Sequence, residues 1–535
     1  MEEVPIAGTS LLSASLGSAS SLVVLQAASR IFTFALNQAL VRLASPKTFG
    51  TAAIQFELLL STILFLSREG VRNALLRSAS KPSTSKQIDN ISILPVYFGI
   101  PSAFLLSCIY ICMSSESTRN QPFFTPSVLV YAVAASVELL SEPLYVRAQN
   151  ELRFNIRIRA EGLAVFLKTV FTFVVLAFGP PDWALLAFAA GQMGYGLATF
   201  ATFASVYGVT GHLKLKPIAK GSEDGSSGPR FDPELMRLSK SMTTQSVIKH
   251  FLTEGDKFLV SRLSPLEDQG GYAIASNYGS LVARIVFQPV EEMSRVFFSK
   301  YLASVDGKRN EDKDQDVYRT ASRLLMTLLL VFSHLLLFLA AFAPPYLPIV
   351  TGVLLPPRYR QTSAPQILGA YIYYIPTMAF NGVLEAFFSS ACTPRDLQGQ
   401  SRMMMAASAG FVVASFVLSQ TFGMGDVGLI WANVANLGLR AAYAWVFARR
   451  FFKEKGLVGA ITLSDALPPV QVMGAFAAAA AIVRASALRH SDLPPTLLAQ
   501  RAHIAVGGTT GVLCLLSCYI FERRRFAETL RILRS

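Results

Sequence analysis

The sequence predicts an all-α polytopic membrane protein, with about fourteen transmembrane helices in two pseudo-repeated lobes around a central polar cavity. Three observations lead to this fold class: an apolar composition, a series of apolar segments long enough to span a bilayer, and polar residues at helical spacing inside those segments. The interruptions between the segments are too short for an ordinary soluble domain.

The composition is far more apolar than that of a soluble protein. Of the 535 residues, 52% are hydrophobic and only 15% are charged, whereas about 25% of residues are charged in a typical soluble domain. Windows of about 19 residues detect transmembrane helices. They place apolar segments near 19–43, 50–67, 92–113, 127–147, 161–178, 184–209, 240–262, 271–294, 322–343, 364–391, 403–421, 427–448, 467–487 and 502–521.

The net charge of +14 comes from loops rather than from the apolar segments. Most of the Lys and Arg residues lie in loops that share one side of the membrane with the N-terminus. Because cytosolic loops are enriched in these residues, the pattern predicts cytosolic N- and C-termini. The basic charge is therefore a topology signal, and no nucleic-acid partner is expected.

The sequence contains no motif for ATP binding, for a cofactor or for a metal site. It contains no GxxxxGK[ST] phosphate loop. The cysteine pairs Cys108/Cys112 and Cys514/Cys518 are interpreted as packing residues rather than metal ligands. The acidic run at 312–316 is interpreted as a solvated charge run, so we expect no cofactor, no metal and no enzyme activity.

Two stretches about 220 residues apart resemble each other and indicate an internal repeat. LVRLASPKTFGTAAI (40–54) and LVSRLSPLEDQGGYAI (259–274) each close a polar helix, turn through Ser-Pro and Gly, and start an apolar helix. About six helices separate the copies, which predicts a parallel repeat related by an axis along the membrane normal. The predicted organisation is an N-terminal lobe (1–210), a cytosolic linker (211–236), a C-terminal lobe (237–448) and two additional helices with a basic tail (449–535).

Polar residues form a face on five of the apolar segments. On the first segment they are Gln26, Arg30, Thr33 and Asn37, at steps of four, three and four that line one side of a helix. The other polar faces comprise Glu138, Glu142, Tyr145 and Gln149; Asn277, Ser280, Arg284 and Gln288; Asn381 and Glu385; and Asn433, Asn436 and Arg440. A single face of this kind can be a hydrogen-bonded contact between helices, whereas five together favour a shared hydrated cavity.

The segment 240–262 is the most highly charged of the apolar segments. Its titratable residues lie on or beside one helix face: Lys249, His250, Glu254, Asp256 and Lys257. They form either a structural ion-pair cluster or a cavity wall whose pairs exchange during conformational change, since buried charges must be paired. Gly255 would permit a local break in this helix. Glu57 and Lys168 are two further ionisable residues inside apolar segments.

Five segments carry motifs that match one known family: QAASRIFTFALNQALVR (26–42), STILFLSREGVR (61–72), SEPLYVRAQN (141–150), FLTEGDKFLV (251–260) and FQPVEEMSRVFFSKYLA (287–303). On these motifs the chain resembles the eukaryotic endoplasmic-reticulum dolichol-linked oligosaccharide flippases (Rft-one type), within the multidrug/oligosaccharidyl-lipid/polysaccharide exporter superfamily. The resemblance covers essentially the whole chain. It implies fourteen helices in two lobes, alternating access without ATP, and a dolichyl-pyrophosphate heptasaccharide cargo moved from the cytosolic to the lumenal leaflet of the endoplasmic reticulum for N-glycosylation.

The resemblance also implies roles for individual residues. Arginines suit bidentate capture of phosphate, so the expected pyrophosphate-binding residues are Arg30, Arg42, Arg284, Arg440 and Lys168. The polar faces would accommodate sugars. The residues at the cytosolic helix ends look like gate or structural pairs: Arg68, Glu69, Arg72, Glu291, Glu292 and Arg295.

Three alternative functions remain open. The first is an accessory protein that holds the oligosaccharide lipid or scaffolds enzymes of the N-glycosylation pathway. The second is a membrane glycosyltransferase, which predicts that Asp312 and Asp314 are essential. The third is a drug/proton antiporter, which predicts that efflux depends on Glu138 or Glu254.

Overall fold

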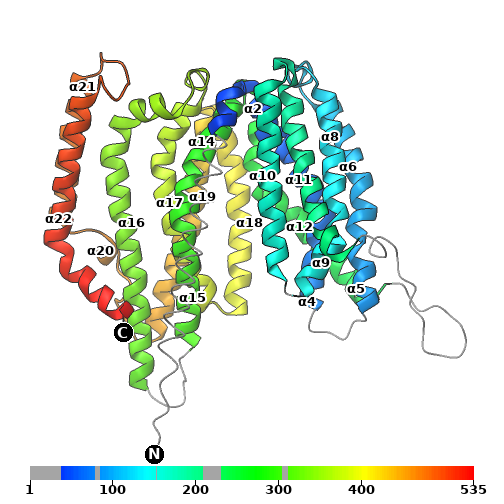
Figure 1. Cartoon of the computed structure of the whole chain (residues 1–535). Helices are drawn as coiled ribbons and strands as arrows, with labels where there is room; N and C mark the ends of the chain where they lie inside the picture. Colours follow the sequence, from blue (N-terminus) through cyan, green and yellow to red (C-terminus); the bar gives the residue numbers. More distant parts are fainter. Residues whose placement is uncertain (1–37, 79–84, 152, 209–230, 304–310, 535) are drawn as a thin grey trace, which may run out of the picture. The chain divides into compact units, whose positions relative to one another are not determined.

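The computed structural model describes residues 38–78, 85–151, 153–208, 231–303 and 311–534, and within these ranges the chain is helical with no β-strand (Figure 1). The all-α fold predicted from the sequence is confirmed. Ten helices of the described part are long and apolar enough to cross a membrane. The chain is therefore a multi-pass membrane protein.

Thirteen of the fourteen expected segments fall on described helices. Three of them, at 240–262, 271–294 and 427–448, are helical but belong to none of the ten candidate spans. These three carry the charged and amide residues singled out in the sequence, which lower their hydropathy. The remaining segment, at 19–43, lies mostly outside the described residues, of which 38–43 are helical.

The described residues form two compact units, one within Thr33–Ala273 and the other from Ile274 to the C-terminus. The boundary falls inside α14 (Leu266–Val282). The first unit contains the helical elements α2 (Pro46–Gly50), η1 (Thr51–Phe56), α3 (Glu57–Leu64), η2 (Phe65–Glu69), α4 (Gly70–Ser78), α5 (Ser85–Ser92), α6 (Leu94–Met113), α7 (Glu116–Arg119), α8 (Phe124–Leu140), α9 (Glu142–Asn150), α10 (Phe154–Phe178), η3 (Pro181–Trp183), α11 (Ala184–Tyr207), α12 (Pro233–Thr253) and α13 (Gly255–Leu263).

The second unit continues from α14 through the C-terminal helices. Its elements are η4 (Ala283–Phe287), α15 (Gln288–Ala303), α16 (Glu311–Leu354), η5 (Pro357–Tyr359), α17 (Ala364–Ala391), α18 (Pro394–Phe416), η6 (Val417–Thr421), α19 (Asp426–Glu454), α20 (Leu463–Ala466), α21 (Val470–Arg489) and α22 (Arg501–Arg534). Most of the predicted linker lies outside the described residues, and the division into lobes stays a prediction. Helices α12 and α13, expected in the C-terminal lobe, pack within the first unit.

Each unit has its own apolar core. In the first unit Phe56 is fully buried and its ring centroid lies 4.9 Å from that of Tyr131. In the second unit Phe388 packs against Phe447 with ring centroids 4.5 Å apart. Aromatic pairs at these separations contribute beyond the area they bury, so they help to hold the helices of each unit together.

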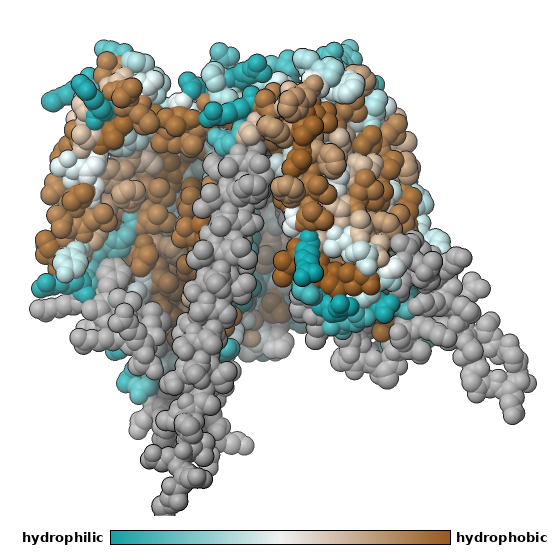
Figure 2. All heavy atoms as spheres, viewed as in Figure 1, coloured by the Kyte–Doolittle hydropathy of each residue, from teal (hydrophilic) through white to brown (hydrophobic). Residues whose placement is uncertain are grey.

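The outer helices expose apolar side chains to their surroundings. Figure 2 shows brown, hydrophobic residues along the visible helices and teal, hydrophilic residues at their ends. Only 17% of the apolar window of Asn155–Phe178 is buried, against 61% of that in Pro46–Leu75. A soluble protein rarely exposes so much contiguous apolar surface, so these faces are suited to lipid.

Two local irregularities occur at residues that the sequence singled out. The helix is interrupted between α12 and α13 at Glu254, which confirms the predicted local break beside Gly255. The π-helical turns η2 and η4 contain Arg68 and Arg284, respectively. Single π-turns inside helices are frequent at functional sites. The turn η2 ends on Glu69, the first residue of a Glu-x-x-Arg motif, and η4 ends shortly before a second such motif, which begins at Glu292.

Candidate functional site

Two ion pairs join the second apolar helix to the fourth in the first unit. Arg68 Nη1 donates to Glu138 Oε1 at 2.7 Å. One turn further along, Arg72 Nη2 donates to Glu142 Oε2 at 2.6 Å, and its Nε donates to Oε1 of the same carboxylate. The arginines and the glutamates are each four residues apart, so the two pairs form successive rungs between neighbouring helix faces.

The second rung is the more deeply buried of the two. The Glu142 side chain is 0% exposed and that of Arg72 only 19%. The Arg72 guanidinium carbon lies 3.8 Å from the ring centroid of Tyr145, which is a cation–π contact. In the first rung, Glu138 Oε2 is buried with no hydrogen-bond partner among the described residues. Each rung neutralises its own charge.

The local sequence explains how Glu142 reaches this position. Helix α8 ends at Leu140 and α9 begins at Glu142, with Pro143 in its first turn. Proline has no N–H to continue the hydrogen-bond ladder of the preceding helix, so the helix breaks beside Glu142. The carboxylate then lies in the first turn of α9, where the helix dipole favours negative charge.

A second group of charges surrounds the break between α12 and α13. Lys257 Nζ lies 2.8 Å from Glu254 Oε2, and Lys168 Nζ lies 3.6 Å from Glu57 Oε2. Lys257 and Glu57 also interact electrostatically. Two acids and two bases thus balance within one unit.

The neighbouring polar residues of the same helices are also satisfied. Asp256 accepts from its neighbour's backbone N–H at 2.8 Å and from the Tyr272 hydroxyl at 3.3 Å. His250 Nε2 lies 2.9 Å from Thr62 Oγ1. These contacts support the ion-pair interpretation of 240–262.

The two corners of the predicted repeat lie against each other in the first unit. A Cβ built on Gly50 would approach the backbone N of Gly270 to 2.6 Å, so only glycine fits there. Lys47 Nζ lies 3.1 Å from Glu267 Oε1 across this contact. We call this contact, formed by residues 46–50 and 266–270, the corner contact.

An amide network continues from the corner contact into the first unit. Gln55 Nε2 donates to Gln269 Oε1 at 2.7 Å, and the Tyr110 hydroxyl donates to Gln55 Oε1 at 2.7 Å. Thr118 Oγ1 accepts a longer bond of 3.3 Å from the same Nε2. The sequence analysis missed this network, although a glutamine inside an apolar segment was a signal for it.

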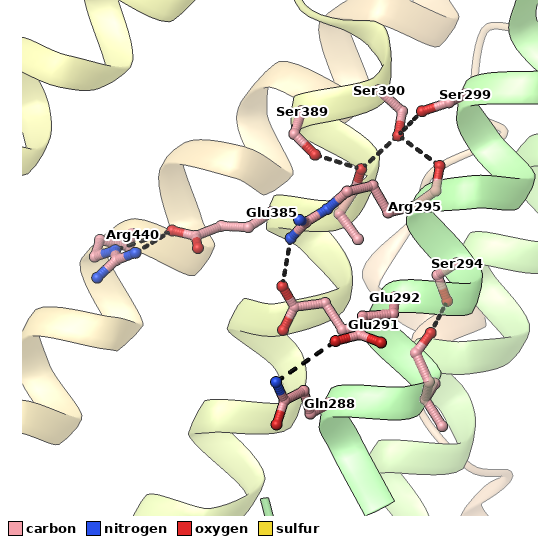
Figure 3. Close-up of polar contacts among 12 residues, drawn as sticks. Gln288, Glu291, Glu292, Ser294, Arg295, Ser299, Glu385, Ser389, Ser390 and Arg440 are labelled. Atoms are coloured by element: carbon pink, nitrogen blue, oxygen red, sulfur yellow. Dashed lines mark hydrogen bonds and ion pairs between the residues drawn. The ribbon is translucent and has the colours of Figure 1, made fainter. Parts of the chain in front are cut away.

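The second unit holds its own pairs, on α15, α17 and α19 (Figure 3). Arg440 donates from Nη2 and Nε to Glu385 Oε1 at 2.6 and 2.9 Å. Arg295 Nη2 donates to Glu291 Oε1 at 2.6 Å within α15. A Cβ on Gly382 of α17 would lie 3.0 Å from Glu291, so the two helices approach closely beside these acids.

Arg284 lies at the π-turn η4 and is exposed. Its Nη2 donates to the backbone oxygen and to Oδ1 of Asn277 at 3.2 and 2.9 Å, and its Nε donates to the backbone oxygen of Ser280 at 3.4 Å. All of these acceptors are neutral. These bonds orient the guanidinium along its own helix.

Comparison with known proteins identifies the family. The family model described as "Rft-1: Rft protein" matches residues 14–532. The chain belongs to the Rft protein family. A curated member from Yarrowia lipolytica is 35% identical over 492 residues, which cover 83% of this chain and 71% of that protein. Another, from Xenopus tropicalis, is 32% identical, with 93% and 92% covered. Both are named "Man(5)GlcNAc(2)-PP-dolichol translocation protein RFT1".

The fold of this Rft-family chain also has a known counterpart. The solved structure titled "Lipid II flippase MurJ, inward closed conformation" has a TM-score of 0.58, with 94% of this chain and 99% of that chain covered. At 13% identity the likeness concerns the fold alone. The family resemblance and the exporter-type fold predicted from the sequence are both confirmed.

The structure pairs most of the site residues expected for this Rft-family chain within their own unit. Among the remaining ones, Arg42 is exposed, Glu69 accepts from Asn73 Nδ2 at 3.3 Å, and Gln288 Nε2 lies 3.5 Å from Glu292. The buried oxygens of two amides have no hydrogen-bond partner among the described residues: Asn381 Oδ1 and Asn436 Oδ1. Asn433 is half-buried on α19. The expected residues outside the described part are Gln26, Arg30, Asn37 and the side chain of Lys249.

Proposed function

We propose that this chain translocates the dolichyl-pyrophosphate heptasaccharide Man5GlcNAc2 from the cytosolic to the lumenal leaflet of the endoplasmic-reticulum membrane, for N-glycosylation. The observation that carries the substrate is the family relationship: the curated relatives are named for this translocation and match most of the chain. A multi-pass helical architecture with exposed apolar helices is consistent with a lipid transporter.

The proposed recognition of the pyrophosphate depends on arginines. Arg284 is exposed at the π-turn η4, and a guanidinium suits bidentate capture of a phosphate. Arg440 is already bound to Glu385, and it could bind a phosphate only by leaving that carboxylate. Arg30 and Arg42 are the other arginines proposed from the sequence. We therefore assign the pyrophosphate to Arg30, Arg42 and Arg284, with Arg440 and Lys168 in secondary roles.

The lipid tail imposes a lateral path on the transport. Removing the tail from lipid into a polar chamber would cost about 0.8 kcal/mol for each CH2 group. The tail therefore stays in the bilayer while the headgroup crosses. Because the sequence has no phosphate loop for ATP, net transport follows the concentration gradient, kept up by consumption of the cargo on the lumenal side.

We propose alternating access, with the corner contact as the closed lumenal gate. With the N-terminus in the cytosol, the Ser-Pro corners at 45–46 and 264–265 lie at the lumenal ends of their helices. The two corners touch through glycine and through the Lys47–Glu267 pair. Release of the headgroup to the lumen requires them to separate.

The first test measures exchange of labelled lipid-linked heptasaccharide in liposomes, timed by its exposure to an external mannose-binding lectin. We expect wild-type protein to accelerate exchange, Arg284→Ala to slow it at least tenfold, and Arg319→Ala to leave it unchanged. Arg319 is an exposed arginine of the same unit, paired with Asp316 and outside the proposed site. Exchange no faster than in protein-free liposomes, with binding intact, would support the accessory function and overturn the flippase proposal.

The gate is tested by a crosslink across the corner contact. Lys47→Cys with Glu267→Cys, joined by a bifunctional thiol reagent, should abolish exchange, in a background where the exposed Cys108 and Cys112 are replaced by serine. A local crosslink at the C-terminal end of α9, Arg147→Cys with Glu151→Cys, controls for the reagent. Undiminished exchange in the locked protein would contradict alternating access through this gate.

A further inference from the structure

Three potential metal ligands meet between α16 and α22 of the second unit. The ligand atoms of His334, Cys518 and Glu522 all lie within 4.8 Å of one another. Cys518 and Glu522 are four residues apart and so share one face of α22, while His334 comes from α16. Spacing along the chain does not predict this cluster, because 188 residues separate His334 from Glu522.

The hydrogen bond at Nδ1 of His334 orients the ring and leaves Nε2 facing the cluster. His334 Nδ1 lies 2.8 Å from the backbone oxygen of Leu330. A carbonyl oxygen only accepts, so Nδ1 carries the hydrogen, and Nε2 of the neutral ring presents a lone pair. This backbone bond is the usual way in which a protein orients a metal-binding histidine.

Nε2 faces a carboxylate that is cut off from water. It contacts Glu522 Oε2, and the Glu522 side chain is 0% exposed. Glu522 Oε1 is buried and has no hydrogen-bond partner among the described residues. Burying a charged oxygen without a partner is costly. The carboxylate therefore requires a cation beside it, which is either a proton on Nε2 or a metal ion bound by both groups.

We propose that His334 Nε2, Cys518 Sγ and Glu522 bind one divalent transition-metal ion, with Zn2+ as the best match. Imidazole, thiolate and carboxylate are the ligand types of zinc sites, with bonds of about 2.0–2.3 Å, and a fourth tetrahedral position remains for water. The thiolate favours zinc over magnesium or calcium. On binding, the Cys518 thiol gives up its proton to solvent. One thiolate and one carboxylate then cancel the charge of the ion, so the occupied site is neutral.

The packing of α22 gives such an ion a structural role. Only 11% of the apolar window of Arg501–Arg523 is buried inside the protein, so apolar packing holds this helix weakly. Cys514, one turn before Cys518, belongs to an apolar cluster with Phe342 and Phe476. A metal ion bridging His334 to α22 would add a fixed link between the last helix and α16, independently of the transported substrate.

The test is the zinc content and cobalt spectrum of the full-length protein, purified in detergent without chelators. We expect about one zinc per chain in wild type, and thiolate-to-cobalt charge transfer when Co2+ replaces zinc. Cys518→Ala should abolish this band and weaken zinc binding at least tenfold, and Glu522→Gln should weaken binding while the band remains. Cys514→Ala is the matched control, because this buried cysteine donates to the backbone oxygen of Ala475 and lies outside the cluster.

Several results would overturn the proposal. One is a wild-type protein that holds no stoichiometric zinc even after zinc is added. Another is a charge-transfer band that persists in Cys518→Ala, because the metal would then bind elsewhere. If Glu522→Gln does not fold, Cys518→Ser keeps the test decisive. If added zinc leaves the unfolding temperature unchanged and acidification raises it, the cation between His334 and Glu522 is a proton.

Discussion

Removing Arg72 should destabilise the protein far more than removing an arginine from a chemically similar exposed pair. Arg72 binds Glu142 beside Tyr145, with the carboxylate fully buried. Arg147 binds Glu151 at 2.9 Å, but those side chains are 44% and 37% exposed. The comparison therefore varies burial while it keeps the type of ion pair.

The magnitude follows from the burial of the stranded charge. Deleting one partner of a buried ion pair costs about 3–5 kcal/mol, because the other charge is left without compensation. Deleting one partner of an exposed pair costs about 0.2–1 kcal/mol. We expect Arg72→Ala to lower the free energy of unfolding by about 3–5 kcal/mol, and Arg147→Ala to lower it by less than about 1 kcal/mol.

The assay is equilibrium unfolding of purified protein in mixed micelles, read as a free energy of unfolding for each variant. A double-mutant cycle with Glu142→Ala separates the pair from the loss of packing. The double variant should recover part of the stability lost in Arg72→Ala, with a coupling energy of about 2–3 kcal/mol. Equal losses for Arg72→Ala and Arg147→Ala, or no coupling in the cycle, would refute the argument from burial.

Three further predictions concern the corner contact, the second unit and the pH dependence. Gly270→Leu should force the facing turns apart and reduce crosslinking across the corner contact several-fold, as counted by gel shift. Arg440→Ala should cost about 1–3 kcal/mol in the same unfolding assay, between the exposed and buried limits, because Glu385 is 22% exposed. The hydrogen bond from Arg147 holds the pKa of Glu151 below its ordinary value of 4.5. That contribution is present above about pH 4.5 and is lost as the pH falls through the lowered pKa. Glu151→Gln should therefore be less stable than wild type by under about 1 kcal/mol at neutral pH, and equally stable in acid.

The fold was accessible from the sequence because hydropathy and helical spacing are local properties. The apolar windows located thirteen helices of the described part. The internal repeat read from the Ser-Pro-Gly corners stays a prediction. The spacing of Glu138 and Glu142 placed them on one helix face. Their partners were not found, since 70 residues separate Glu142 from Arg72. A matching signal was present: two acids and two arginines with the same four-residue spacing.

The metal cluster and the amide network could not be predicted from the spacing of residues within one helix. His334, Cys518 and Glu522 are each unremarkable in their own helices, and only the packing of α16 against α22 brings them together. The hydrogen-bond partner of Gln55 is Gln269, which lies 214 residues away in the sequence. Such contacts depend on which helices are neighbours, which a periodicity in one segment does not specify.

The energies of the corner contact and of the Arg72–Glu142 pair indicate which of the two separates during transport. The corner contact contains an ion pair whose side chains are 58% and 59% exposed, and the adjoining amide network adds a hydrogen bond between Gln55 and Gln269. These contribute about 0–1 and about 0.5–1.5 kcal/mol, respectively. The Arg72–Glu142 rung costs about 3–5 kcal/mol to break by losing one partner. Opening at the corner is therefore far cheaper than rearranging the rungs, and a difference of a few kcal/mol is the range in which a ligand can shift a two-state equilibrium. In the proposed cycle the corner contact opens and closes, whereas the rungs persist and keep the second and fourth helices moving together.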